Sequence, residues 1–182
     1  DYATGVKLLN VESTYARKIL VKGQIIGIGD TGLDSGKLDT LTEDLRGSVI
    51  AGYPESLVSE SDEDDSPWRD MEGHGTHVTG SILGNGFHSG GKLHGVAPEA
   101  HAIMMNIASP SLMDDDDTLL TKPYALGARI HSNSWGSGKT FGEYNVISHL
   151  VDKIQWTHQD YLFVFAIGNE GRDLNKDGVI DL

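Results

Sequence analysis

Three short apolar runs constrain the fold of this chain more than any other feature of its sequence. They lie at 24–29 (QIIGIG), 102–107 (AIMMNI) and 162–167 (LFVFAI). Apolar runs of this length, stopped by turn-forming or polar residues, predict buried β-strands. Residues 129–134 (RIHSNS) are also strand-like, so at least part of the fold is a sheet.

Segments with helical patterns alternate with these strands. Residues 144–157 carry aliphatic side chains at helical spacing, and 119–126 fits a helix that ends before a glycine. Further helices are expected at 11–20 and 73–83. Strands that alternate with helices predict an α/β fold, in which a parallel sheet is covered by helices on both faces.

Parallel sheets place their chemistry at the carboxyl ends of their strands. Asp30, Ser134 and Asn169 each lie at or just after the end of a predicted strand. Because these ends meet at one edge of a sheet, the three residues are candidates for a common site.

Charge and composition argue against several functional classes. The chain has 27 Asp and Glu residues against 14 Lys and Arg, a formal net charge of -13. Nucleic acid is therefore not expected as a partner, because phosphate binding depends on clustered Lys and Arg. The absence of cysteine excludes disulfides, thiolate metal sites and a cysteine nucleophile. No apolar run approaches the ~18 residues of a membrane-spanning helix, so no membrane partner is expected.

The segment from Gly27 to Gly32 (GIGDTG) follows the first predicted strand and allows two interpretations. As a GxGxxG string it matches the dinucleotide-binding pattern, which would make the chain a nucleotide-binding domain. Asp30 argues against that interpretation, since it would stand where a pyrophosphate must approach bare backbone amides. A carboxylate at a strand end is better suited to accept a hydrogen bond from an imidazole and to fix its tautomer.

The motif HGTH spans His74 to His77 and opens the helix expected at 73–83. Two histidines three positions apart can share a helix face and bind a metal, but zinc needs a third ligand and no HExxH pattern is present. The glycines beside His74 would instead let a substrate or a backbone segment pass close to it. The motif therefore favours His74 as a catalytic base, and His77 as a structural, buried histidine.

The motif GNEG, at 168–171, follows the last predicted strand. One interpretation is an ordinary turn. The other is that the side-chain amide of Asn169 donates a hydrogen bond to an oxyanion developing in a transition state, an interaction worth roughly 3–4 kcal/mol.

Residues 173–181 (DLNKDGVID) match the calcium-loop pattern D-x-[DN]-x-[DN]-G. Ca²⁺ prefers oxygen ligands at alternating positions of such a loop, with a glycine at its sharp turn. The pattern predicts Ca²⁺ as a cofactor, and a plain acidic turn is the alternative. The expected ligands are Asp173, Asn175, Asp177, Asp181 and the carbonyl oxygen of Val179.

Five motifs follow one another along the chain: DTG at Asp30, HGTHVTGSI at His74, GVAP at 95–98, NSWG at 133–136, and GNEG at 168–171. Each is of moderate specificity alone. In this order they resemble the subtilases, the subtilisin-like serine proteases, over nearly the whole chain. The sequences of these motifs are most similar to those of the oxidatively stable alkaline subtilases, a bacterial subgroup.

This resemblance implies a subtilisin-like fold of three layers, with a parallel sheet between helices, incomplete in this chain. It implies a secreted, extracellular serine endopeptidase that is stabilised by calcium and acts on polypeptide substrates. Asp30 would be the acid of the catalytic triad, His74 the general base, and Asn169 the side chain of the oxyanion hole.

The same resemblance implies residues that bind substrate and a second calcium ion. Ser134, Trp135 and Gly136 would form one wall of the primary specificity pocket, with Gly168 near the other. Their backbone would pair with an extended substrate. Asp39 stands at the family's spacing from Asp30 for the aspartate of a calcium site, which the carbonyls of the loop at 85–92 would complete.

The catalytic serine is the main departure from the family pattern. In subtilases it lies in a Gly-Thr-Ser segment well beyond the GNEG motif, and no such string occurs here. We therefore expect residues 1–182 to be the N-terminal portion of a subtilase catalytic domain, inactive alone. The serine would lie on a missing segment or on a second chain, a C-terminal fragment of the same protease. The alternative is an inactive calcium-binding or protein-binding module derived from a subtilase, against which the three retained catalytic residues argue.

Overall fold

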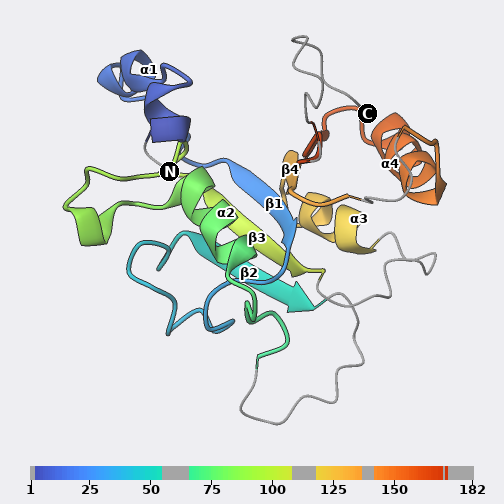
Figure 1. Cartoon of the computed structure of the whole chain (residues 1–182), viewed down its shortest axis with the longest axis horizontal. Coiled ribbons are helices and arrows are strands. Elements are labelled where there is room, and N and C mark those ends of the chain that lie inside the picture. Colours follow the sequence, from blue (N-terminus) through green and yellow to red (C-terminus); the bar gives the residue numbers. More distant parts are fainter. Residues whose placement is uncertain (1–2, 55–65, 108–117, 137–141, 170, 172–182) are drawn as a thin grey trace.

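The computed structural model describes residues 3–54, 66–107, 118–136, 142–169 and 171. Its five strands form one sheet in the order β2-β3-β1-β4-β5, and every neighbouring pair is parallel. Figure 1 shows β2, β3 and β1 side by side. The strands are β1 (Ile25–Asp30), β2 (Val49–Pro54), β3 (His101–Asn106), β4 (Ile130–Asn133) and β5 (Leu162–Phe165). The α-helices are α1 (Glu12–Ala16), α2 (His74–Leu83), α3 (Thr118–Ala125) and α4 (Val146–Thr157), with short turns of other helix types at η1 (Ala3–Lys7) and η2 (Phe87–Ser89).

Two apolar cores, one on each face of the sheet, create three layers. Alternate residues of a strand point to opposite faces, and β3 shows this directly. Its Ala102 and Met104 join a core that includes Leu83 of α2, whereas Ile103 and Met105 join a core that includes residues of α3 and α4. The predicted α/β fold with a parallel sheet between helices is therefore confirmed.

The strand that sequence analysis missed is β2, at one edge of the sheet. Only its first two residues, Val49 and Ile50, are large aliphatic side chains, and Gly52 and Pro54 are typical strand breakers. Gly52 is needed because a Cβ atom there would overlap the ring of Trp68. The edge strand tolerates Pro54 because only one side of it is paired.

Two predicted features are wrong in detail. The run at 162–167 was expected to be a buried strand, yet three of the four residues of β5 are exposed, because β5 is the edge strand opposite to β2. The helix expected at 11–20 is only the five-residue α1. Asn10 and Lys18 on either side of it adopt positive φ angles of 54° and 61°, which no α-helix allows.

Several exposed apolar side chains lie on and around β5 and α4. Leu162, Val164 and Ile167 are exposed on and just after β5, as is Trp156 of α4.

Within the described ranges, no helix combines the length and the apolar character that crossing a membrane requires.

Candidate active site

Asp30 is the last residue of the central strand β1, and it is only 2% exposed. Parallel pairing of β1 with both β3 and β4 places it at the carboxyl edge of the sheet. Its Oδ1 atom accepts a hydrogen bond from the backbone N–H of Thr31 at 2.8 Å. Its Oδ2 atom is buried and has no hydrogen-bond partner among the described residues.

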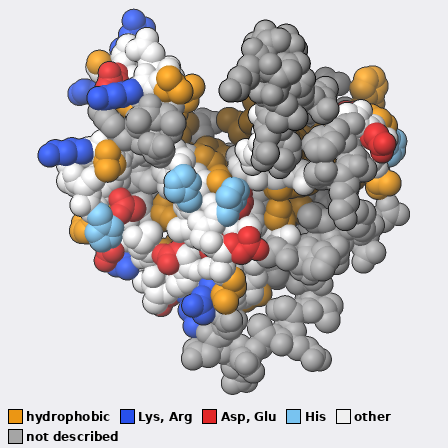
Figure 2. All heavy atoms as spheres, viewed as in Figure 1, with side chains coloured by type: hydrophobic (Ala, Val, Ile, Leu, Met, Phe, Trp, Pro, Cys, Tyr) orange, Lys and Arg blue, Asp and Glu red, His pale blue; other side chains and the backbone are white. Residues whose placement is uncertain are grey.

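His74 is the first residue of α2 and contacts Asp30 across 44 positions of sequence. Its Nδ1 atom lies 2.6 Å from Oδ1 of Asp30. Just over half of the His74 side chain, 52%, is exposed, and Figure 2 shows histidine and acidic side chains together on one face of the molecule. The structure thus holds one side of the imidazole on a buried carboxylate and leaves the ring accessible from outside.

This contact determines which nitrogen can act as a base. A buried carboxylate accepts the proton on Nδ1, so neutral His74 keeps Nε2 free of a proton and able to accept one. The hydrogen bond to Asp30 raises the pKa of His74, burial opposes this, and the charges of Asp30, Asp70 and Glu72 raise it further. The pair can therefore take up a proton and stabilise the resulting imidazolium.

The raised pKa predicts an acid limit to any activity that uses His74 as a base. The pKa lies above the ordinary value of 6.5, so the neutral base is present above that raised value and is lost as the pH falls through it. We expect kcat/KM of the complete protein to fall with an apparent pKa above 6.5. An NMR titration of the His74 ring checks the assignment: Asp30→Asn should move its midpoint to lower pH, and an unchanged midpoint would contradict it.

Asp70 is a residue at this site that sequence analysis missed. Its carboxylate accepts hydrogen bonds from Thr31 and from the first turn of α2 at Gly73 and Thr76. The signal in the sequence was an aspartate three positions before a glycine that opens a helix. A glycine provides no capping side chain, so a nearby carboxylate is needed to accept from the helix N-terminus.

The remaining predicted substrate and oxyanion residues follow β4 and β5. Ser134, Trp135 and Gly136 come directly after β4, and Gly168 and Asn169 come shortly after β5. Both strands are parallel to β1, so these segments leave the sheet at the edge that carries Asp30. Asn169 is exposed.

The Trp135 side chain packs against the apolar core of the sheet. Its ring lies edge-on to Phe165 with centroids 5.2 Å apart. Its Nε1 atom is 3.3 Å from the place that a Cβ atom on Gly29 would occupy. The glycine before Asp30 thus leaves space for the side chains of His131, Asn133 and Trp135, which would all lie 3.2–3.3 Å from that Cβ atom.

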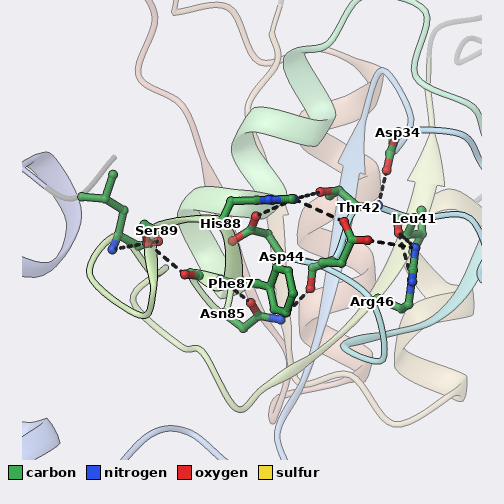
Figure 3. A network of polar contacts seen from close by, with 12 residues as sticks. Asp34, Leu41, Thr42, Asp44, Arg46, Asn85, Phe87, His88 and Ser89 are labelled. Atoms are coloured by element: carbon green, nitrogen blue, oxygen red, sulfur yellow. Dashed lines mark hydrogen bonds and ion pairs between the residues drawn. The ribbon is translucent and has the colours of Figure 1, made fainter.

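Only one of the two predicted calcium sites includes residues that the structure describes. The loop at 173–181 lies outside the described residues, whereas Asp39 is described and exposed. The loop at 85–92 contacts the turn after Asp39: Asn85 donates to the carbonyl oxygen of Glu43 at 2.8 Å, and His88 lies 3.2 Å from the Glu43 carboxylate. Figure 3 shows this network of polar contacts. Among the residues described, no group of three or more His, Asp or Glu side chains is arranged to hold a metal, so calcium at Asp39 stays a prediction.

Known proteins share sequence and fold with this chain. A protein-family model with the description "Subtilase family" matches residues 21–181. The serine protease/ABC transporter B family protein tagD of Dictyostelium discoideum is 31% identical over 169 residues, which cover 81% of this chain and 9% of that protein. The major intracellular serine protease of Bacillus subtilis is 30% identical over 103 residues, which cover 57% of this chain and 30% of that protein.

Solved structures show the same fold. The CspB protease of Clostridium perfringens superposes with a TM-score of 0.58 at 26% identity, over 84% of this chain and 37% of that one. The chain thus spans well under two thirds of the length of these relatives. The family model covers most of this chain, and its parallel sheet is subtilisin-like. This chain therefore belongs to the subtilase family of serine proteases.

Proposed function

We propose that this chain is the part of a serine endopeptidase that supplies the triad acid Asp30, the general base His74 and the oxyanion donor Asn169. The observation that carries the proposal is the 2.6 Å contact between Nδ1 of His74 and Oδ1 of Asp30 at the carboxyl edge of the sheet. A half-exposed imidazole held by a buried carboxylate is the arrangement that activates a serine hydroxyl.

In the proposed mechanism, Nε2 of His74 removes the proton from the serine hydroxyl as its oxygen attacks the peptide carbonyl carbon. Asp30 holds the ring in the required tautomer and stabilises the imidazolium that forms. The imidazolium then gives its proton to the leaving amine, and the acyl-enzyme is hydrolysed by water in the reverse sequence of proton transfers. The proton does not pass on to Asp30.

The oxyanion and the substrate would be bound by the segments that follow β4 and β5. Asn169 is exposed after β5, where its side-chain amide is available to donate to the tetrahedral oxyanion. We assign the backbone of Ser134, Trp135 and Gly136 to one wall of the primary pocket and Gly168 to the other. The packing of the Trp135 ring against Phe165 supports a backbone role for this wall, because the side chain is engaged elsewhere.

The serine is proposed to lie on a polypeptide segment outside this chain. Exposed apolar side chains on β5 and α4, with Leu162, Val164 and Trp156 among them, support this. An apolar edge strand normally pairs with or is covered by further structure. Without that segment, residues 1–182 would lack a nucleophile and would be inactive.

Calcium and secretion are part of the same proposal. The loop at 173–181 would hold Ca²⁺ through carboxylate, amide and carbonyl oxygens, and Asp39 would contribute to a second site. Bound calcium would stabilise the protein, and the complete enzyme would act outside the cell on polypeptides. These assignments rest on the sequence pattern and on the family.

The experiment is denaturing intact-mass analysis of the purified protein after treatment with a fluorophosphonate probe, which reacts with activated serines. We expect the probe on a polypeptide segment other than residues 1–182, and no labelling in a His74→Ala variant, whose serine has no base. Labelling that persists in His74→Ala, or no labelling of any segment, would overturn the proposal.

A further inference from the structure

Both carboxylate oxygens of Asp70 are occupied by hydrogen-bond donors from three neighbouring segments. Oδ1 accepts from the Thr31 hydroxyl at 2.9 Å and from the backbone N–H groups of Gly73 at 2.7 Å and Glu72 at 3.1 Å. Oδ2 accepts from the backbone N–H of Thr76 at 2.8 Å and from its hydroxyl at 2.6 Å. Five donors on one carboxylate exceed what an ordinary surface aspartate collects.

These contacts replace the missing cap of helix α2. The N-cap residue Gly73 has a φ of 85° and no side chain with which to accept a hydrogen bond. The free N–H groups of the first turn are satisfied from outside: Gly75 donates to the Thr31 hydroxyl at 2.9 Å, and Thr76 donates to Asp70. A negative charge at this end of a helix is also favourable because of the helix dipole.

The same carboxylate connects the helix to the loop that carries the acid. Thr31, which donates its hydroxyl to Asp70, also donates its backbone N–H to Asp30. The backbone of Asp34 continues the connection, accepting from the Asp70 N–H at 3.1 Å and donating to the Thr76 hydroxyl at 2.8 Å. The start of α2 and the loop after β1 are therefore joined through Asp70 at two points of the loop, Thr31 and Asp34.

Asp70 remains charged at neutral pH. Partial burial acts to raise the pKa of Asp70, but hydrogen bonds from Thr76, Gly73 and Thr31 outweigh it and lower the pKa below its ordinary value. The Asp70 charge in turn acts, after the larger effect of Asp30, to raise the pKa of His74. Glu72, which is exposed, exerts a charge effect of the same sign.

We propose that Asp70 is a positioning residue for the catalytic base: it holds the first turn of α2 on the loop after β1, so that His74 stays within hydrogen-bond distance of Asp30. The inference rests on the proposed function. Asp70 acts through the helix and through Thr31, not on the substrate. Its removal should therefore slow the chemical step and leave substrate binding unchanged.

The test compares Asp70→Ala, Asp70→Asn and Glu72→Gln in the complete protease, with kcat and KM measured against pH. Asp70→Ala removes all five bonds, and we expect kcat to fall about tenfold with KM within about twofold. This is less than the ~100-fold cost of a 1 Å misplacement, because Thr31 still caps Gly75. Asp70→Asn keeps one acceptor oxygen and should show an intermediate kcat.

Glu72→Gln separates charge from hydrogen bonding. It should keep the wild-type kcat on the pH plateau, while both it and Asp70→Asn move the acid limit of kcat/KM to lower pH. Equal kcat values for Asp70→Ala and Glu72→Gln would overturn the inference. If Asp70→Ala does not fold, Asp70→Asn serves as the test. An unchanged kcat and an unchanged pH profile in Asp70→Asn would overturn the inference that Asp70 positions His74. Activity that survives in His74→Ala would instead refute the proposed function.

Discussion

Under the proposed function, replacing His74 with alanine is expected to lower kcat of the complete protease by about 10⁶-fold, and replacing Asp30 with asparagine by about 10⁴-fold, the losses typical of a Ser-His-Asp triad. The reason lies in the contact between Nδ1 and Oδ1. Without His74 nothing removes the serine proton. In Asp30→Asn the introduced amide can favour the wrong tautomer of the ring and cannot stabilise an imidazolium. Steady-state hydrolysis of a peptide p-nitroanilide measures both losses.

The double variant of His74 and Asp30 should be no slower than His74→Ala alone, because the two residues act as one unit. His77→Ala is the matched control. His77 lies three positions further along α2 and is exposed, so the expectation that it is buried is wrong. Its removal should change kcat by no more than about twofold. Losses that add in the double variant, or a comparable loss in His77→Ala, would mean that His74 and Asp30 do not form a catalytic pair.

Replacing Gly75 with alanine is expected to cost about 100-fold or more in kcat and to lower the free energy of unfolding by about 1–3 kcal/mol. A Cβ atom there would overlap the carbonyl oxygen of Gly32 and lie 3.1 Å from the Cβ of Asp30. The obstacle is backbone, which cannot rotate away as a flexible side chain can. The start of α2 must therefore move off the loop after β1, which separates His74 from Asp30.

Gly80→Ala is the matched control for this prediction. Gly80 lies in the same helix, and a Cβ atom added to it would meet nothing within 4 Å. Alanine there should stabilise the protein by about 0.5–1 kcal/mol, because glycine is a poor helix former. Urea unfolding of the complete protease and its kcat give both quantities. Equal activity of the two variants would show that the close approach of α2 to Gly32 does not position the base.

The sequence was sufficient for those parts of the fold that depend on local pattern. Apolar runs at 24–29 and 102–107 predicted the central strands β1 and β3, and the spacing of aliphatic residues predicted α4. The parallel arrangement followed from the alternation of strands with helices. Local pattern was insufficient for the sheet edges: β2 has only two large aliphatic residues and contains a glycine and a proline, and β5 is apolar but exposed.

The candidate site divides in the same way. Residue type and position at a strand end were enough to select Asp30, and glycine-flanked His74 was recognisable in its motif. Their 2.6 Å contact joins residues 44 positions apart, and it exists because β1 lies at the centre of the sheet and α2 packs across it. Asp70 and Gly75 reach the loop after β1 only through that packing. Local sequence determines which elements form and which side chains are chemically able to react. Only the tertiary structure decides which of those side chains meet, because contacts between distant segments depend on the order of strands in the sheet and on the close packing of backbone.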